Sequence, residues 1–221
     1  MLHALLIATG LALLWNTGVS GFDIRFYYFV IAVALTALWG FSRFAAAGEA
    51  QSSVSWTIIS AIQGLVLITG AWLALSWLRF QPQGSWLILQ LLLIIWVADI
   101  AAYFTGRAFG KRKLAPKISP GKTWAGVTGA MVFAPLAALA CARFSPLPEI
   151  GAITTVLLAL VTVSASIGGD LFISLLKRAA GVKDSGKLLP GHGGILDRFD
   201  SLITGSVFFV LGLLFLIEHS G

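Results

Sequence analysis

Hydrophobic side chains fill seven long runs of this chain, and short polar segments separate the runs. A transmembrane helix needs about 20 consecutive, mostly apolar residues. Seven stretches come close to that length and predict membrane-spanning helices: 2–19, 24–41, 54–78, 86–104, 124–142, 154–176 and 202–217. The first stretch also has the length of a signal peptide, but it lacks a basic leading segment and a clear small-residue cleavage site. We therefore expect an all-α, polytopic membrane bundle of about seven transmembrane helices.

Composition strengthens this prediction and excludes two classes of protein. Hydrophobic residues make up 58% of the chain and charged residues 11%, whereas a soluble domain has about 45–50% and about 25%, respectively. The polar side chains are too few to cover a water-soluble globule or to keep a chain disordered. The single cysteine, Cys141, excludes a disulfide framework and a cysteine-based metal site, so we expect it to pack in the apolar interior.

Positive charge is distributed unevenly among the connecting segments. Of the 15 Lys and Arg residues, 6 fall in residues 106–123 and 5 in residues 177–198, and both segments follow even-numbered predicted spans. Cytoplasmic segments of membrane proteins carry an excess of Lys and Arg. We therefore expect a cytoplasmic N-terminus, two cytoplasmic basic loops and a C-terminus on the opposite side of the membrane.

The two basic loops carry more than an orientation signal requires, although topology alone is an alternative explanation for their charge. The second loop interleaves acids with bases, and both loops are rich in proline and glycine. Glycines let backbone amides approach an anion closely, and such arrangements bind phosphate groups. Gly121-Lys122-Thr123 resembles the end of a P-loop, but Pro116 stands where the first glycine is required. His192, between two glycines, is expected to order its loop or to contact phosphate.

Two acidic residues fall within predicted spans, Asp99 near the end of the fourth and Asp170 within the sixth. A charge at the centre of a transmembrane helix costs at least about 2.5 kcal/mol, so such residues usually serve a cation, a proton path or a buried partner. Pairing with loop arginines is the structural alternative for both. Asp170, with Asp184, Asp197 and Asp200, supplies hard oxygen ligands that favour Mg²⁺. Magnesium surrounded by Lys and Arg is the usual environment of a nucleoside triphosphate.

Two sequence blocks extend this chemistry. The longer block reads Ser174-Leu-Leu-Lys177-Arg178-x4-Lys183-Asp184-Ser-Gly186-x3-Pro190-Gly191-His192-Gly193-Gly194-Ile-Leu-Asp197-Arg198-Phe-Asp200. The shorter block reads Asp99-Ile-Ala-Ala-Tyr103-x2-Gly106-x3-Gly110-Lys111, followed by Leu114-Ala-Pro116-Lys117-Ile-Ser119-Pro120-Gly-Lys122-Thr123. Together they resemble the signature regions of the phosphatidate cytidylyltransferases, also called CDP-diacylglycerol synthases. The resemblance covers about residues 99–201.

The resemblance implies a division of the chain and a reaction. Residues 1–98 would form the N-terminal transmembrane helices, shortened relative to the eight or nine spans usual in the family, and residues 99–221 the catalytic transmembrane region with both basic loops. In the reaction, CTP and phosphatidate give CDP-diacylglycerol and diphosphate, with Mg²⁺ and, as a second ion, K⁺. Since the lipid phosphate is itself the nucleophile, catalysis requires mainly positioning and charge neutralisation.

The resemblance also implies roles for particular residues. Asp170 and Asp197 are expected to bind metal, with Asp99 as a further candidate ligand. Besides the two main ligands, the expected catalytic residues are Lys177, Arg178, Lys183, Asp184 and Arg198. The residues expected to bind substrate phosphates are Lys111, Lys117, Ser119, Lys122, Thr123, Lys187, His192, Gly193 and Gly194.

Two other functions are left open by the sequence. A CTP-dependent lipid kinase of the dolichol- or phytol-kinase type would transfer the γ-phosphate instead. An ion-coupled transporter could use Asp99 and Asp170 as an ion path, but it would not need a glycine-rich basic loop. We expect CTP, phosphatidate and the lipid bilayer as partners and no nucleic acid, and we leave homodimer formation open. The expected location is the bacterial inner membrane, with the active site facing the cytoplasm.

Overall fold

The fold is taken from a computed structural model that describes residues 30–35, 37, 54–116, 118–144, 151–179, 181–182, 185–186, 194 and 196–219. Within these residues, five helices are long and apolar enough to cross a membrane. The helices and strands are α3 (Val54–Phe80), α4 (Gly84–Phe109), β1 (Lys113–Ala115), β2 (Ser119–Thr123), α5 (Trp124–Arg143), α6 (Ala152–Ala179) and α7 (Leu196–His219). This confirms the prediction of an all-α, polytopic membrane protein.

The two N-terminal predicted spans are described only in small part. The span 2–19 lies outside the described residues. Of the span 24–41, only residues 30–35 and 37 are described, and they are helical. The total of seven spans and the cytoplasmic N-terminus therefore stay predictions.

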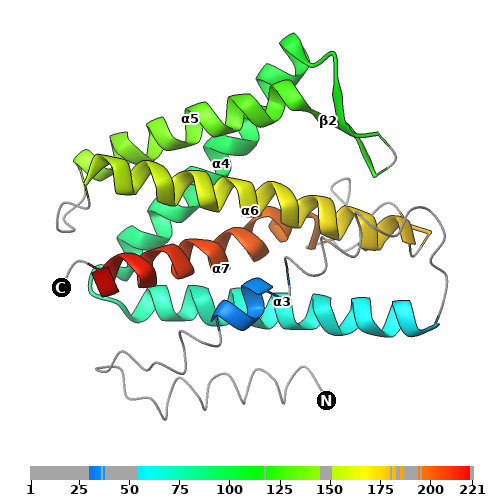
Figure 1. Cartoon of the computed structure of the whole chain (residues 1–221), viewed down its shortest axis with the longest axis horizontal. Helices are drawn as coiled ribbons and strands as arrows, with labels where there is room; N and C mark the ends of the chain where they lie inside the picture. Colours follow the sequence, from blue (N-terminus) through cyan, green and yellow to red (C-terminus); the bar gives the residue numbers. More distant parts are fainter. Residues whose placement is uncertain are drawn as a thin grey trace.

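The helices are packed in the order α5, α6, α7 and α3, with α4 against α5 and crossing behind α6 and α7 (Figure 1). Their shared core is apolar and includes the fully buried side chains of Leu91, Ile94 and Phe209. The crossing of α6 and α7 is close because Gly169 leaves room for Thr204, whose hydroxyl donates to the carbonyl of Ala165 at 2.9 Å. Small residues and hydrogen-bonding hydroxyls are the usual means by which transmembrane helices approach one another.

Several helices extend beyond the spans that hydropathy predicts. Helix α4 continues to Phe109 rather than ending at residue 104, and polar side chains of its last turns form hydrogen bonds within the helix. The Arg107 guanidinium donates to the Tyr103 hydroxyl at 3.0 Å, and the Thr105 hydroxyl donates to the carbonyl of Ala101 at 2.7 Å. As a consequence, Asp99 lies well inside α4, and its predicted position near the helix end is corrected.

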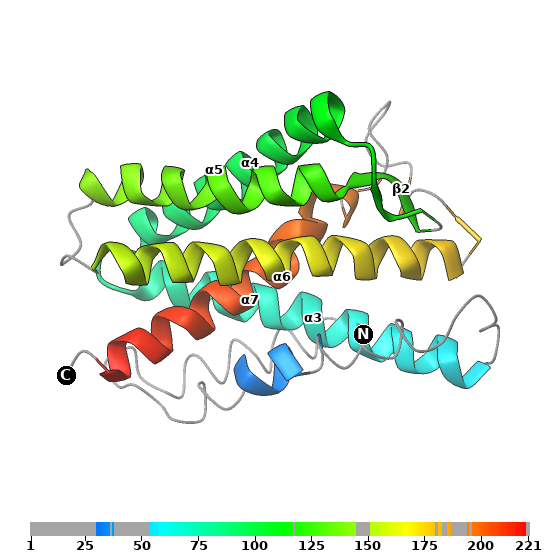
Figure 2. The same ribbon diagram turned by 45° about the horizontal axis from the view of Figure 1, so that its top comes forward.

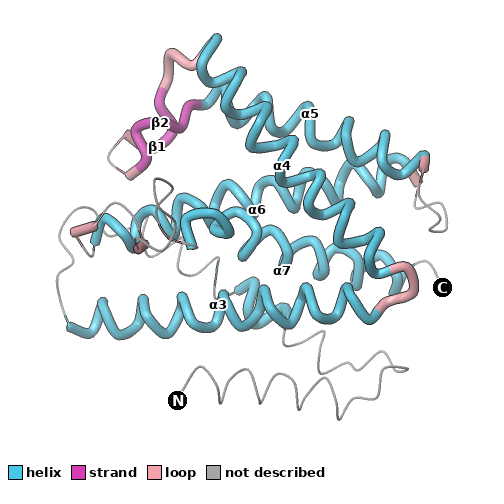
Figure 3. The backbone as a smooth tube through the Cα atoms, turned by 180° about the vertical axis from the view of Figure 1, so that it is seen from behind, coloured by secondary structure: helices cyan, strands magenta, loops and turns pink. Residues whose placement is uncertain are grey.

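The first basic loop contains a small β-hairpin that hydropathy did not predict. Strands β1 and β2 pair antiparallel, with Lys113 opposite Thr123 and Ala115 opposite Ser119 (Figure 3). The second strand leads directly into α5, where the Thr123 hydroxyl accepts a hydrogen bond from the amide of Gly126 at 3.1 Å. This is a regular helix N-cap. The hairpin is thereby fixed to the end of the bundle where α6 ends and α7 begins (Figure 2).

Candidate active site

The candidate active site is a cavity of about 200 Å³ at the hairpin end of the bundle, named the polar cavity here because charged and hydroxyl side chains interrupt its mainly apolar wall. Helices α4, α5, α6 and α7 and the residues of the hairpin all contribute to its wall. The lining residues that carry polar or charged groups are Asp99, Tyr103, Lys122, Thr123, Asp170 and Ser201. The cavity therefore brings residues of the shorter block together with Asp170 and Ser201, which flank the longer block, and its most distant lining residues by sequence, Ala98 and Ser201, are 103 positions apart.

Asp170 of α6 is bound to the hairpin through an ion pair. The Lys122 ammonium lies 2.5 Å from one carboxylate oxygen, and each side chain retains about a quarter of its exposure, 25% and 24%. The other oxygen of Asp170 accepts a hydrogen bond from the Ser174 hydroxyl at 3.2 Å. Both oxygens of Asp170 thus have a polar partner and are partly shielded from solvent. The ion pair joins β2 to α6.

Two further carboxylates are close enough to Asp170 to repel it. Asp99 on α4 and Asp200 on α7 each have an unfavourable electrostatic interaction with Asp170, and Lys122 offsets part of it at both. Lys177 also acts favourably on Asp200. Three carboxylates from three helices therefore share few ammonium groups, in surroundings where charge is expensive to leave unbalanced. The negative charge of these carboxylates is balanced in part by Lys122 and Lys177.

The second ion pair lies where α7 begins. The Lys177 ammonium of α6 contacts one oxygen of Asp197 at 2.6 Å. The other oxygen accepts hydrogen bonds from the amides of Ser185 and Gly194, both at 2.9 Å. Asp197 also stands in the first turn of α7, where the helix dipole favours negative charge.

These contacts determine the charge state of Asp197. Burial by itself tends to raise the pKa of this carboxyl. The hydrogen bonds from Lys177 and from the Ser185 and Gly194 amides outweigh burial and hold the pKa well below its usual range. Asp197 is therefore ionised at any physiological pH, and it anchors described residues of the second basic loop to the bundle.

The end of α6 directs the chain back toward Asp197. The amide of Gly181 donates to the carbonyl of Arg178 at 3.0 Å, and the amide of Val182 donates to that of Lys177 at 2.9 Å. With Gly181 at a φ of 71°, this is a Schellman ending, which glycine adopts without steric cost. The reversal carries the chain toward Ser185, whose amide binds Asp197.

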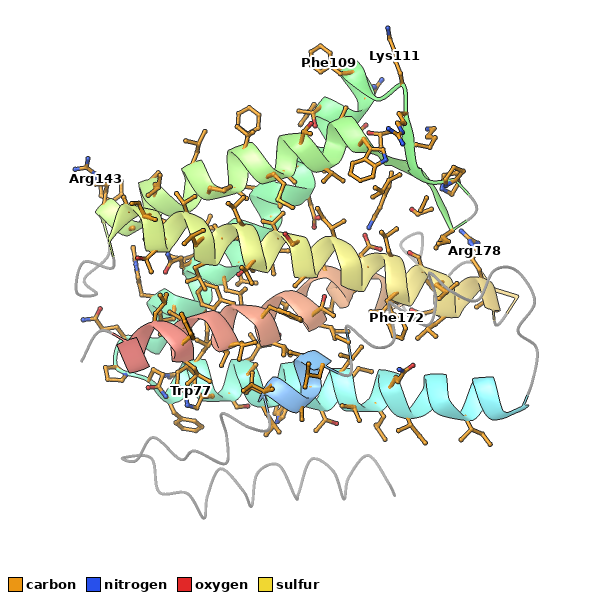
Figure 4. The ribbon with its side chains drawn as sticks, in the orientation of Figure 1. Trp77, Phe109, Lys111, Arg143, Phe172 and Arg178 are labelled. Carbon is orange, nitrogen blue, oxygen red and sulfur yellow. The ribbon has the colours of Figure 1, made fainter. Side chains whose placement is uncertain are left out.

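Arg178 bridges the two basic loops. Its Nε donates to the carbonyl of Ile118 in the hairpin at 3.3 Å. Figure 4 shows Arg178 at the end of α6, below the hairpin, and Lys111 pointing away from the bundle at the opposite end of the hairpin. Among the predicted site residues, Arg178 is thus placed to position the hairpin, whereas exposed Lys111 is not brought to the cavity.

The remaining predicted site residues fall into two groups. Ser119 and Thr123 lie in β2, and Gly194 is a buried amide donor to Asp197. The residues outside the described part are Lys117, Lys183, Asp184, Lys187, His192 and Gly193. Arg198 lies in α7, but its side chain is outside the described part as well. The assignments of these residues stay predictions.

Two residues of the candidate site, Ser174 and Asp200, were not assigned to it from the sequence. Ser174, which binds Asp170, was quoted in the longer block without a role, although its place four residues after Asp170 puts both on one helix face. Asp200 was weighed as a ligand but not assigned to the site. Its spacing three residues after Asp197 was the available signal for a place on the same helix turn.

The acidic residues of the site have the ligand type that suits Mg²⁺, but the described ones are not close enough together in this structure to hold it. All are carboxylates, the ligands that Mg²⁺ accepts, and no sulfur ligand lies among them. In the part of the chain that the structure describes, no three acidic, histidine or cysteine side chains are grouped closely enough to hold a metal ion. Asp170 and Asp197, predicted to share a cation, are each paired with a separate lysine. The metal assignment stays a prediction.

Comparison with known proteins decides the family. The sequence model described as "Cytidylyltransferase family" matches residues 1–216. The chain belongs to this family. The cytidylyltransferase is 38% identical to the phosphatidate cytidylyltransferase of Pseudomonas aeruginosa over 206 residues, which cover 83% of this chain and 76% of the relative. The enzyme of the same name from Brucella suis is 38% identical over 214 residues, which cover 96% of this chain and 73% of the relative. The one from Haemophilus influenzae is 50% identical over 129 residues, which cover 57% of this chain and 45% of the relative.

Proposed function

We propose that this cytidylyltransferase joins the cytidylyl group of CTP to the phosphate of phosphatidate, releasing diphosphate and forming CDP-diacylglycerol. The observation that carries the proposal is the family match across residues 1–216. Relatives that carry the name phosphatidate cytidylyltransferase support the lipid substrate. The enzyme is thus a nucleotidyltransferase of phospholipid biosynthesis.

The site geometry supports this chemistry because the reaction needs no protein nucleophile. The lipid phosphate is already ionised near neutral pH and attacks the α-phosphorus of CTP, from which diphosphate departs. The enzyme's contribution is to hold two anions together and to neutralise the charge that develops on the phosphate oxygens. Lys122 and Lys177, each at the end of an ion pair, are the described ammonium groups best placed for this.

The proposed cation is Mg²⁺, held by Asp170 and Asp197, with Asp99 adding a further carboxylate and K⁺ as a second ion. Bound Mg²⁺ would withdraw charge from phosphate oxygens. Asp170 and Asp197 now hold the ammonium groups of Lys122 and Lys177. When the carboxylates bind a cation, both lysines become available to phosphate oxygens, so the same four side chains can serve metal and substrate.

The proposed location is the inner membrane of a bacterium, with the cavity facing the cytoplasm. The described spans establish a multi-pass membrane protein. The hairpin end of the bundle carries described residues of both basic segments, among them Lys122, Lys177 and Arg178, and cytoplasmic segments are the ones enriched in Lys and Arg. This orientation gives the cavity access to cytoplasmic CTP and keeps the lipid tails in the bilayer.

The test is a defined reaction with purified protein in detergent. Tritiated CTP, phosphatidate and Mg²⁺ should yield a cytidine-labelled lipid and an equal amount of diphosphate. Chelation of Mg²⁺ should stop the reaction, and added Mg²⁺ should restore it. The Arg143→Gln variant, which loses an exposed cation at the far end of α5, should have the same activity as the wild-type protein (Figure 4). Absence of a cytidine-labelled lipid under all these conditions contradicts the proposal.

A further inference from the structure

Helix α6 separates the polar cavity from a larger apolar groove. The groove has a volume of about 400 Å³ and lies between α3, α6 and α7. Its wall includes Ala37, Leu67, Leu160, Gly168, Phe172 and Phe208. On the polar side, α6 contributes Ile167 and Asp170 to the cavity. The helix thus presents a catalytic carboxylate on one face and a hollow apolar surface on the other.

The groove continues toward the end of the bundle that carries the active site. A second apolar cavity, of about 220 Å³, shares Leu67 and Phe172 with the first. It extends along α6 past Leu176 and ends at Lys177, the partner of Asp197. Figure 4 shows Phe172, which lines both cavities, on α6. The two cavities adjoin at Leu67 and Phe172, and together they form an apolar channel along α6 whose lining ends at Lys177 and Val182.

The channel is longer than one leaflet of a bilayer is thick. Along α6 it extends from Leu160 to Leu176, which is about 24 Å at 1.5 Å per residue. Half of the hydrocarbon core of a membrane is about 15 Å thick. A chain that starts at Lys177 and follows the channel can therefore run from the headgroup level to the bilayer centre.

Two glycines keep the channel open. A Cβ atom added at Gly64 or at Gly168 would meet nothing within 4 Å, so the space beside both is free. The neighbouring Gly169 differs, because a Cβ atom there would collide with the side chain of Thr204 on α7. Gly169 is thus required for helix packing, whereas Gly64 and Gly168 border empty apolar space.

We propose that this channel holds an acyl chain of the lipid substrate, with the lipid phosphate at Lys177. The proposal rests on the proposed function and assigns the substrates to opposite faces of α6, with the lipid tail in the channel and CTP in the polar cavity. Continuity with Lys177 decides the occupant, since a lipid chain attached to a phosphate needs an apolar path that begins at a cation. Because the chain comes from the bilayer and not from water, the channel contributes position more than affinity.

The test is to fill the channel and to vary the length of the lipid chain. Gly168→Leu places a branched side chain in the free space, about 13 Å along α6 from Lys177. With dioleoyl phosphatidate, kcat/KM should fall at least about tenfold, because the phosphate can no longer reach its place while the chain is displaced. With dihexanoyl phosphatidate, whose chains end before residue 168, kcat/KM should change less than about twofold, and the KM for CTP should stay the same.

Two controls make the result decisive. Ala140→Leu introduces the same side chain on the exposed surface of α5 and should leave kcat/KM with both lipids unchanged. Gly168→Ala is the smaller version of the substitution, and it keeps the proposal testable if Gly168→Leu fails to fold. Equal losses with both lipids would indicate that a protein segment or a second copy fills the channel, and unchanged kinetics with both would indicate that nothing does. Either result overturns the proposal.

A direct measurement separates this proposal from the proposed function. Phosphatidate with a photoreactive diazirine in one acyl chain should label peptides that contain Leu67 or Phe172 in the wild-type protein, and Gly168→Leu should reduce that labelling. Labelling does not require turnover. If no cytidine-labelled lipid forms but the channel is labelled, the proposed function fails and the lipid channel stands. If turnover is normal and labelling is confined to α5, the channel proposal fails alone.

Discussion

Replacing Asp170 by Asn separates catalysis from folding at the centre of the site. The substitution keeps the side-chain volume and the oxygen that accepts the Ser174 hydroxyl, and it removes the negative charge paired with Lys122. An ion pair whose partners are each a quarter exposed contributes about 1 kcal/mol or less. The variant also removes the repulsion of Asp170 with Asp99 and Asp200, which acts in the opposite direction. The net change in the free energy of unfolding should therefore be within about 1 kcal/mol.

The effect on the reaction should be far larger. Loss of one group that stabilises a transition-state charge reduces turnover about 10²–10³-fold, and Asp170 is the carboxylate that pairs with Lys122 and interacts electrostatically with Asp99 and Asp200. We expect Asp170→Asn to lower kcat at least 10²-fold, an order-of-magnitude figure, while the midpoint of thermal denaturation in detergent moves by no more than about 4 °C. Arg143→Gln should change neither quantity. A stable Asp170→Asn protein with wild-type kcat and unchanged Mg²⁺ dependence would refute the assignment.

Three other predictions concern different parts of the structure. Asp197→Asn should abolish turnover and lower the free energy of unfolding by about 2 kcal/mol, because it breaks the charged contact with Lys177 and weakens a backbone hydrogen bond. Since the pKa of Asp197 is lowered in the folded state, its stabilising contribution is complete above the unfolded pKa of about 3.9 and is lost as the pH falls from there through the folded pKa. The thermal midpoints of wild type and variant should therefore converge in acid, and a constant difference would contradict this. Gly169→Ala should destabilise the protein by about 2 kcal/mol, because the added methyl group collides with Thr204. Gly168→Ala should be neutral or stabilise the protein by up to about 1 kcal/mol. Equal midpoints of thermal denaturation for the two variants would show that α6 and α7 are not closely packed at this crossing. A cysteine introduced at Lys113 in β1 should react slowly with an impermeant thiol reagent applied to intact cells, because the proposed orientation places the hairpin in the cytoplasm. Rapid labelling would reverse the orientation.

The transmembrane helices could be predicted from the sequence because hydropathy reports directly on what the hydrocarbon region accepts. It failed at their ends for the same reason, since α7 begins at Leu196 with a turn that contains Asp197 and lies outside the apolar segment. The hairpin was not predicted because strands of three and five residues are too short to show an alternating pattern, and Pro116 and Pro120 indicated a loop.

Individual site residues could be predicted, but their partners could not. Asp170 was recognisable as an acid inside a span, and Lys122 as a base in a glycine-containing loop. Their pairing depends on how α6 packs against the hairpin. Asp170 and Lys122 are 48 positions apart in the sequence, and no local sequence pattern predicts a contact between them. Asp170 and Asp197 are predicted to share a cation, and this stays a prediction. The structure adds what the sequence could not show, namely that Lys122 of the hairpin contacts Asp170 and Lys177 of α6 contacts Asp197.

The fate of the phosphates of CTP tests the central claim most directly. Purified protein is incubated with phosphatidate, Mg²⁺ and CTP that carries ³²P at either the α- or the γ-position, and the lipid and aqueous phases are separated. Cytidylyl transfer predicts that α-label enters the lipid and γ-label leaves as diphosphate, with Asp170→Asn reducing both together. Recovery of γ-label in the lipid would show phosphoryl transfer by a lipid kinase and would contradict the account.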